Sequence, residues 1–283
     1  MSRALSLLAE WPVGRAAAAV VGPSGLLAGH GDLAAPFRLA SVTKPLAALA
    51  TLVAVEEGAV ALDTPLSAAG AAVAEVSAQL PGATLAHLLA HASGIGPEKP
   101  IRAADVGTRR IYSNAGFDLI GTIVEQASDM PFAQYLDEAV CRPLQLGATE
   151  LNGSPAKDGR APVADLARVL HELLSPSGLL HPSTLAAATS VQFPNLPGVL
   201  PGYGRQHHND WGLGFEVRDH KGPHWTGSHN SPATFGHFGR SGTMFWVDPV
   251  ARLGLVALAD RDFDEWAIRA WPVLSDAVLA EFG

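Results

Sequence analysis

The sequence SVTKPLAALATLVAVEEG, residues 41–58, contains the feature that decides the fold. Ser41 and Lys44 lie three residues apart at its start, and this separation brings two side chains to one face of a helix. The residues that follow are apolar almost all round, which is typical of a helix buried in a core. Proline is tolerated only near the first turn of a helix, so Pro45 predicts that a helix begins within about a residue of Ser41.

This pair predicts a nucleophile beside its own base. A serine hydroxyl attacks well only when a neighbouring group, such as an uncharged lysine, accepts its proton. At a helix start, free backbone N–H groups and the positive end of the helix dipole favour a developing oxyanion. The alternative interpretation is a capping serine beside a solvated lysine. A second match, Ser154 to Lys157, lies in the turn-rich segment NGSPAKDGR and is interpreted as a chance loop match.

Two further segments carry polar groups. Tyr112 and Asn114, in RRIYSNAGFDLIGTIVEQAS, precede apolar residues with helical spacing, so we expect both on a loop before a helix. A phenol can shuttle a proton, and an asparagine amide can bind a substrate carbonyl or orient a lysine. The alternative is an ordinary loop in which Asn114 caps the helix.

The third segment is TFGHFGRSGTMFWVDP, which contains His237 and Gly239. A glycine at a strand edge lets a substrate approach the backbone closely. Residues 220–222 also fit His-x-Gly, and residues 225–227 are another candidate for the same role. We prefer His237 because a long β-type run follows it.

These segments together resemble the serine β-lactamase and penicillin-binding-protein superfamily. The likeness is to class C β-lactamases, D-alanyl-D-alanine carboxypeptidases and β-lactamase-like carboxylesterases. It runs from about residue 16 to the C-terminus and rests on FRLASVTKPL, TLAHLLAHASGI, RIYSNAGFDLIGTIVEQ, PLQLGATEL and GHFGRSGTMFWVDP. The resemblance implies the β-lactamase/transpeptidase-like fold, with the active site between a sheet and a helical part.

The resemblance also implies roles for the polar residues of the first two segments. Ser41 matches the acylated nucleophile, and Lys44 matches its proton acceptor. Tyr112 matches the general acid/base, and Asn114 matches the contact to a substrate amide. Which of Lys44 and Tyr112 is the primary base stays open.

The third segment departs from the family's motif at one position. His237 and Gly239 match a strand motif that is Lys-Thr-Gly or His-Thr-Gly in many relatives, but the middle position here is Phe238. The hydroxyl that helps to bind a substrate carboxylate is therefore missing, although Arg240 could supply a charge. The oxyanion hole would be the backbone N–H groups of Ser41 and Arg240.

The chain organisation predicts an α+β fold. Short strands (AAAAVVG, GLLAG, FRLA) near the N-terminus can pair with strands between residues 211 and 259 in a single antiparallel sheet, and residues 263–282 form a closing helix. We therefore expect a sheet part from residues 1–41 and 205–283, a mainly helical part from 42–204, and the active site between them.

Composition and charge argue against several classes of function. The 283 residues, 48% of them hydrophobic, can bury a large core, and a net charge of −8 without basic runs argues against nucleic acid. The N-terminus lacks a signal-peptide pattern, no stretch reaches transmembrane length, and Cys141 is alone, so we expect a cytoplasmic protein without membrane contact. Six of the 11 histidines lie between residues 207 and 237, but their spacing does not favour a metal site, and no cofactor is implied.

Three functions therefore compete. The first is a serine hydrolase that forms an acyl-enzyme on Ser41 and hydrolyses small esters or amides. The second is a true β-lactamase or D-alanyl-D-alanine carboxypeptidase, and the third is a non-catalytic relative that binds a ligand. Phe238 and the missing signal peptide favour the first over the second, and the presence of the catalytic residue types disfavours the third. The oligomeric state stays open.

Overall fold

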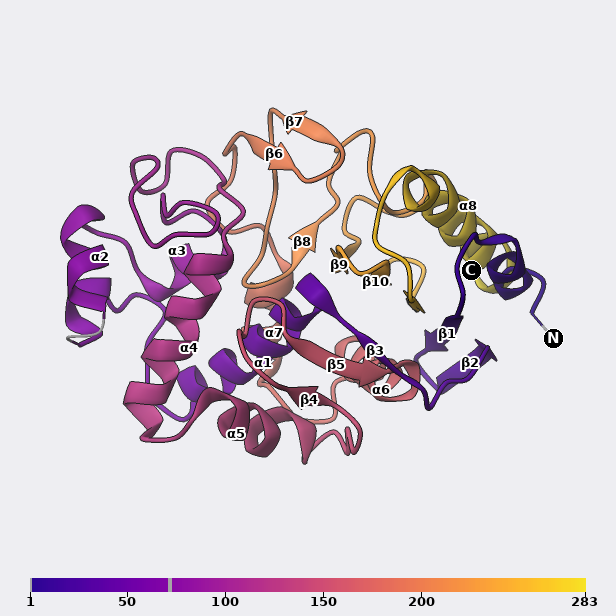
Figure 1. Cartoon of the computed structure of the whole chain (residues 1–283), viewed down its shortest axis with the longest axis horizontal. Coiled ribbons are helices and arrows are strands. Elements are labelled where there is room, and N and C mark those ends of the chain that lie inside the picture. Colours follow the sequence, from indigo (N-terminus) through magenta and orange to yellow (C-terminus); the bar gives the residue numbers. More distant parts are fainter. Residues whose placement is uncertain (1, 71–72) are drawn as a thin grey trace.

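The computed structural model describes residues 2–70 and 73–283 (Figure 1). Its central element is a six-stranded antiparallel sheet with the order β2-β1-β11-β10-β9-β8. The N-terminal part supplies two strands and the C-terminal part four: β1 (Ala16–Gly22), β2 (Gly25–His30), β8 (Glu216–Val217), β9 (Phe235–Gly239), β10 (Thr243–Asp248) and β11 (Leu253–Ala259). The two ends of the chain meet where β1 pairs with β11, and this confirms the predicted antiparallel α+β fold.

Both faces of this sheet are covered, so its central strands are apolar at nearly every position. Side chains alternate between the two faces of a strand. In β1, Ala19 and Val21 face a core shared with α6 (Val163–Leu174), whereas Val20 faces a second core shared with α8 (Glu265–Phe282). The short helix η1 (Leu5–Glu10) also packs into this second core, and in Figure 1 α8 and both chain termini lie at the same end of the molecule.

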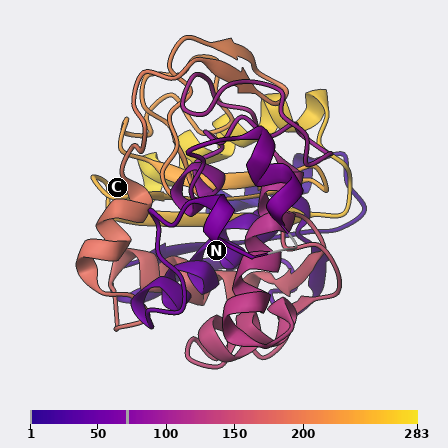
Figure 2. The same cartoon turned by 90° about the vertical axis from the view of Figure 1, so that its left-hand side faces the viewer.

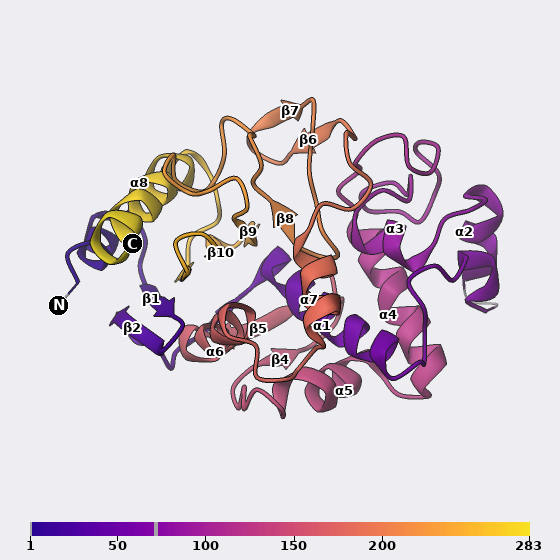
Figure 3. The ribbon, with the colours of Figure 1, turned by 180° about the vertical axis from the view of Figure 1, so that it is seen from behind.

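The other end of the molecule is helical (Figures 1 and 2). It contains η3 (Leu66–Ala68), α2 (Ala74–Gln79), α3 (Leu85–Leu89), α4 (Asn114–Ser128), α5 (Phe132–Leu136) and the π-helical turn η5 (Asp137–Cys141). Helix α1 (Thr43–Glu56) is buried along almost its whole length, as its apolar sequence predicts. Seen from behind, α6 and α7 (Pro182–Thr189) lie on the near side of the molecule (Figure 3).

One strand prediction is wrong. The FRLA segment forms β3 (Pro36–Arg38), but β3 pairs with β5 (Gly159–Pro162) rather than with the large sheet. A three-stranded sheet with the order β3-β5-β4 results, in which β4 is Glu150–Leu151. The pairing buries Phe37 in the core that α6 shares, where an apolar ring is stabilised. A separate hairpin joins β6 (Gly198–Leu200) to β7 (Gly204–Gln206).

Candidate active site

Ser41 lies in η2 (Ala40–Val42), the tight turn between β3 and α1. The preceding residue, Ala40, has a φ of 46°, a left-handed conformation that costs free energy and persists only where its surroundings enforce it. Thr43 Oγ1 donates to the Ala40 carbonyl at 2.7 Å, and Thr243 Oγ1 of β10 donates to the Leu39 carbonyl at 2.8 Å. Contacts on both sides of Ser41 therefore fix the turn that carries its hydroxyl.

Lys44 lies one helical turn after Ser41 and is completely buried. Its ammonium nitrogen is 3.5 Å from Ser41 Oγ, 2.6 Å from Asn114 Oδ1 and 2.9 Å from the Ala156 carbonyl oxygen. It also lies 4.6 Å from the centre of the Tyr112 ring. The side chain is thus held by three acceptors on separate segments, with the serine hydroxyl the most distant of them.

The charge state of Lys44 is set by its burial. Removal from water lowers its pKa from 10.5 to about 7, although the carboxylates of Asp118 and Glu98 oppose the shift. A lysine with this pKa is substantially uncharged near neutral pH. It can therefore accept a proton from a serine hydroxyl, which an ordinary surface lysine cannot do.

Tyr112 provides the second titratable group. Its hydroxyl oxygen is buried and has no hydrogen-bond partner in the described part of the chain, with the Ser41 side chain as its polar neighbour. Burial raises the pKa of the phenol well above its usual value, so Tyr112 keeps its proton. It is therefore a donor, whereas the buried Lys44 is the better acceptor.

His237 of β9 faces the same region. Its Nδ1 lies 2.7 Å from the Phe238 carbonyl oxygen, which can only accept, so Nδ1 carries the proton. Burial, together with the charge of Lys44, lowers its pKa to about 3, and the ring is neutral. Its Nε2 is buried without a hydrogen-bond partner among the residues described, and the ring centre lies 5.8 Å from that of Tyr112.

The end of β9 passes directly beside the nucleophile turn. A Cβ atom on Gly239 would lie 2.3 Å from the Leu39 carbonyl oxygen and 3.2 Å from Ser41 N, so only glycine fits there. The approach brings the backbone that continues into Arg240 next to that of Ser41. This arrangement is compatible with an oxyanion hole made by the N–H groups of these two residues.

Phe238 lies on the opposite face of β9 from His237, within an aromatic cluster. Its ring centre is 5.1 Å from that of Phe263, 5.8 Å from those of Trp225 and Trp271, and 6.1 Å from that of Tyr203. Phe238 also lines the cavity that opens over Ser41. The middle position of the strand motif therefore presents an apolar ring and no hydroxyl.

The predicted site residues surround one cavity of about 990 Å³. Its lining includes Ser41, Tyr112, Asn114, His237, Phe238 and Arg240. Lys44 lies behind Ser41, and Gly239, the last residue of β9, lies between the lining residues Phe238 and Arg240. The ionisable groups of the lining carry both signs; they are Arg38, Lys157 and Arg240, with Glu98, Asp158, Glu216 and Asp262. The structure thus gathers into one place segments that are up to about 200 residues apart in the sequence.

The alternative matches to the strand motif and to Ser-x-x-Lys lie in environments that differ from those of His237 and Ser41. His220 is exposed, whereas Lys221 is buried with its Nζ 2.5 Å from Glu216 Oε1. Trp225 packs in the core beneath α8. The second Ser-x-x-Lys match forms a turn and not a helix, as predicted, yet its Ala156 carbonyl accepts a hydrogen bond from Lys44.

The polar residues around the site have contacts that the sequence predicts only in part. Ser113, and not Asn114, caps α4 by accepting from Gly116 N. Asn114 instead accepts from Lys44 and donates from Nδ2 to Glu98 Oε1 at 2.7 Å, which supports the lysine-orienting role among the alternatives. Glu216, which the sequence did not indicate, is buried and lines the cavity. His91, whose place in LAHLLAHASG favours a role in orienting a nearby loop, is also buried near the site. The Ser113 cap is local, whereas the contact between Lys44 and Asn114 joins distant segments and depends on the folded structure.

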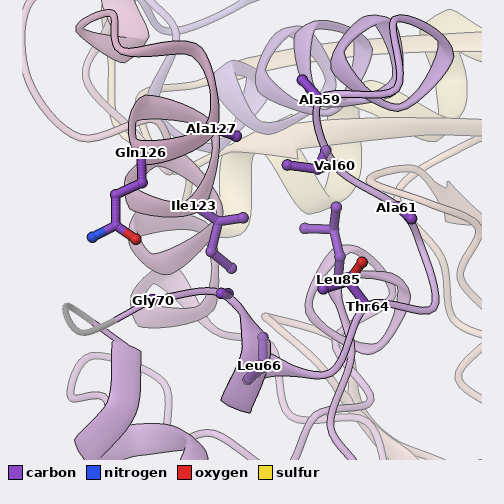
Figure 4. Close-up of a pocket in the computed structure, with 11 residues that line it drawn as sticks. Ala59, Val60, Ala61, Thr64, Leu66, Gly70, Leu85, Ile123, Gln126 and Ala127 are labelled. Atoms are coloured by element: carbon purple, nitrogen blue, oxygen red, sulfur yellow. The ribbon is translucent and has the colours of Figure 1, made fainter.

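A smaller cavity of about 290 Å³ lies between α4 and residues 59–70 (Figure 4). Its labelled lining is mainly small and apolar, with Thr64 and Gln126 as polar members, and it contains no pair of nucleophile and base. Cys141 is buried elsewhere, and burial raises the pKa of its thiol to about 12, which keeps it unreactive. Among the described residues, no His, Cys, Asp or Glu cluster of three or more is arranged to hold a metal ion, and no helix is both long and apolar enough to span a membrane.

The Beta-lactamase family model matches residues 32–278. A β-lactamase from Mycobacterium bovis, known as a crystal structure, superposes with a TM-score of 0.92 over 99% of both chains, at 53% sequence identity.

Two curated relatives are more distant. The D-alanyl-D-alanine-carboxypeptidase/endopeptidase AmpH of Escherichia coli (strain K12) is 28% identical over 157 residues, which cover 45% of this chain and 40% of AmpH. Esterase EstB of Burkholderia gladioli is 32% identical over 145 residues, which cover 38% of this chain and 36% of EstB. The matches span less than half the length of these curated relatives. Because the family match covers most of the sequence and all of the segments around the cavity, the chain belongs to the β-lactamase family, a family of serine hydrolases with carboxypeptidase and esterase relatives.

Proposed function

We propose that the protein is a serine hydrolase that forms an acyl-enzyme on Ser41 and prefers small, uncharged esters. The observation that carries this proposal is the environment of Lys44. Its amine is buried, has a pKa of about 7 and lies 3.5 Å from Ser41 Oγ. A site that only bound a ligand would have no need for a lysine whose basicity is lowered in this way.

The proposed acylation uses the groups around the cavity in sequence. Uncharged Lys44 accepts the Ser41 hydroxyl proton while Oγ forms a bond to the substrate carbonyl carbon. The N–H groups of Ser41 and Arg240 stabilise the negative oxygen, and a donor of this kind typically contributes about 2.7–4 kcal/mol. The bond from carbon to the leaving alcohol oxygen then breaks.

Tyr112 completes the proton transfer. It donates its phenolic proton to the departing alkoxide and regains a proton from the Lys44 ammonium, so the pair ends in its initial protonation state. Water then attacks the acyl-enzyme, and the same relay returns a proton to Ser41 as the carboxylic acid leaves. The high pKa of Tyr112 supports its role as the acid, and the low pKa of Lys44 supports its role as the base.

The preference for uncharged esters rests on Phe238 and His237. Phe238 presents an aromatic face to the cavity where many relatives have a threonine hydroxyl. His237 is neutral, so it provides no positive charge for a substrate carboxylate. Without these two contacts, an anionic β-lactam or D-alanyl peptide loses favourable interactions, whereas an apolar acyl or alcohol group gains contact area.

A second candidate is β-lactam hydrolysis or D-alanyl peptide cleavage. It is favoured by the 53% identity to the Mycobacterium bovis β-lactamase and by the exposed side chain of Arg240 at the cavity. A parallel assay with a short-chain nitrophenyl ester, a chromogenic cephalosporin and a D-alanyl-D-alanine peptide separates the candidates. The proposal requires the highest kcat/KM on the ester, and a higher value on the cephalosporin or peptide would replace it with the second candidate.

A further inference from the structure

His91 is a buried titratable side chain that the proposed reaction does not use. It lies two residues after the end of α3, is 1% exposed and has a φ of 54°. A left-handed backbone conformation costs free energy in a histidine, and it persists only where surrounding contacts enforce it. Both hydrogen bonds that His91 accepts come from the loop that carries Tyr112.

His91 holds the backbone on both sides of Tyr112. Its carbonyl oxygen accepts from Ile111 N at 2.9 Å, and its ring Nδ1 accepts from Ser113 N at 3.2 Å. The ring also packs against the phenol, with centroids 4.7 Å apart. One residue thus fixes the peptide before Tyr112, the peptide after it and one side of its ring.

The other neighbours of His91 leave little room for movement. Its ring meets that of Trp211 edge-on at 4.6 Å and that of Phe117 at 5.4 Å. The start of the loop is fixed separately, because the buried guanidinium of Arg110 donates to the Ala90 carbonyl at 2.7 Å and to the Asn209 carbonyl at 3.1 Å. His91 is thus the residue that combines hydrogen bonds to the backbone on both sides of Tyr112 with a contact to its ring, while the ring centres of Trp211 and His237 lie 5.8 Å from that of Tyr112.

The ring has a defined tautomer. Nδ1 accepts a backbone N–H and so carries no proton, which leaves the proton of the neutral ring on Nε2. This Nε2 is buried and has no hydrogen-bond partner in the described part of the chain. A hydrophobic residue in place of His91 would avoid this unpaired group, so packing alone does not explain a histidine at this position.

We infer that His91 is a positioning residue, whose ring nitrogen and carbonyl hold Tyr112 where its hydroxyl can protonate the leaving group. This inference rests on the proposed role of Tyr112 as the general acid. It predicts an effect that depends on the leaving group. A nitrophenolate departs without help, whereas an alkoxide needs the proton from Tyr112.

The test compares a 4-nitrophenyl ester with an alkyl ester of the same acid in several variants. Active-site titration with a fluorophosphonate corrects each rate for the fraction of reactive Ser41. The rate constant to compare is kcat/KM, because it reports acylation, in which the leaving group departs, whereas both esters share the same deacylation step. Tyr112→Phe should lose about a hundredfold in kcat/KM on the alkyl ester and far less on the nitrophenyl ester. His91→Gly tolerates the left-handed backbone but removes the ring acceptor, and it should lose about tenfold on the alkyl ester and less than about threefold on the nitrophenyl ester.

His91→Asn is the rescue variant, because asparagine also tolerates this backbone and its Oδ1 can accept from Ser113 N. It should recover most of the alkyl-ester activity. In the double variant His91→Gly with Tyr112→Phe, the loss should not exceed that of Tyr112→Phe alone. The matched control is His87→Ala. His87 is half-buried in α3, with its Nδ1 2.8 Å from Thr84 Oγ1 and its ring stacked on Phe193, and its removal should leave the ratio of the two activities unchanged.

An equal loss on both esters in His91→Gly, no recovery in His91→Asn, or losses that multiply in the double variant would each overturn the positioning role. His91→Ala, which also lacks a side-chain acceptor and places only a methyl group on the left-handed backbone, serves the same comparison if His91→Gly does not fold. If Tyr112→Phe itself affects both esters equally, the general-acid role of Tyr112 is overturned, and the inference on His91 with it. A selective Tyr112→Phe with a non-selective His91→Gly overturns the inference on His91 alone.

Discussion

The base strength of Lys44 can be changed with a single charge. Asn114 Oδ1 accepts from Lys44 Nζ at 2.6 Å, so Asn114→Asp places a carboxylate in direct contact with the amine. An opposite charge this close typically shifts a pKa by about 1–3 units toward the charged form. Because Asn114 Nδ2 also contacts Glu98 Oε1 at 2.7 Å, the substitution is made in a Glu98→Gln background, where no second carboxylate opposes the new one.

The direction and size of the change in kcat/KM caused by Asn114→Asp follow from the Lys44 pKa of about 7. Only uncharged Lys44 accepts the serine proton, so turnover rises as the pH rises through this pKa. At pH 7.5 about three-quarters of the lysine is uncharged with a pKa of 7, and about 3% with a pKa of 9. A shift of about two units from a pKa of 7 therefore predicts a roughly 25-fold lower kcat/KM at pH 7.5, recovered above about pH 9.5. The loss at pH 7.5 is smaller in the Glu98→Gln background, because the starting pKa of Lys44 is lower there.

The assay is the pH dependence of kcat/KM on a neutral ester. In the parent Glu98→Gln, loss of a charge that raises the lysine pKa should move the acid limb to lower pH. Asn114→Leu in the same background removes the hydrogen bonds without adding charge, and its loss should not recover at high pH. If the acid limb of the pH profile has the same apparent pKa in folded Asn114→Asp as in its parent, the assignment of this limb to Lys44 is refuted.

Three further predictions concern other parts of the site. Phe238→Thr should raise the ratio of cephalosporin to ester turnover by about tenfold to a hundredfold, because a hydrogen bond to a charged group is worth about 1.5–3 kcal/mol. Lys44→Ala and Tyr112→Phe should each lower turnover far more than folding stability, and the double variant should lose much less than the product of the single losses. Lys221→Met leaves the carboxylate of Glu216 buried without its lysine and should reduce the free energy of unfolding by about 3–5 kcal/mol in urea titrations.

Each of these predictions has a contrary result. A wild type that hydrolyses the cephalosporin with a higher kcat/KM than any neutral ester would disprove the pocket argument and make Arg240 the first residue to test as a carboxylate anchor. Near-wild-type turnover in Lys44→Ala or Tyr112→Phe would argue against a shared relay. An unchanged unfolding midpoint in Lys221→Met would mean that the buried carboxylate finds another partner.

The sequence was sufficient to predict the parts of the site that local spacing controls. Ser41 and Lys44 are brought together by a single helical turn, and Pro45 limits where that turn begins. The apolar run after Lys44 predicted a buried helix, and α1 is buried. The helical spacing of the apolar residues after Tyr112 correctly placed Tyr112 on a loop before a helix, but Asn114, which we expected on the same loop, is the first residue of α4.

Features that depend on pairing between distant segments could not be predicted. Nothing local to FRLA distinguishes a partner in the large sheet from β5, because both choices satisfy the same backbone hydrogen bonds. The carbonyl of Ala156 carries no side-chain signal, and the pKa of Lys44 depends on how completely the fold excludes water from it. The division into residues 1–41 with 205–283 and 42–204, and the cytoplasmic location, stay predictions.

Covalent labelling of Ser41 tests the central claim most directly. Intact-mass analysis after treatment with a fluorophosphonate should give one adduct, which peptide mapping locates to the peptide that contains Ser41, and Ser41→Ala should give none. Lys44→Ala should label much more slowly than wild type while remaining folded, because the hydroxyl then lacks its base. Labelling that persists in Ser41→Ala, or an adduct that maps to Ser154, would contradict the account.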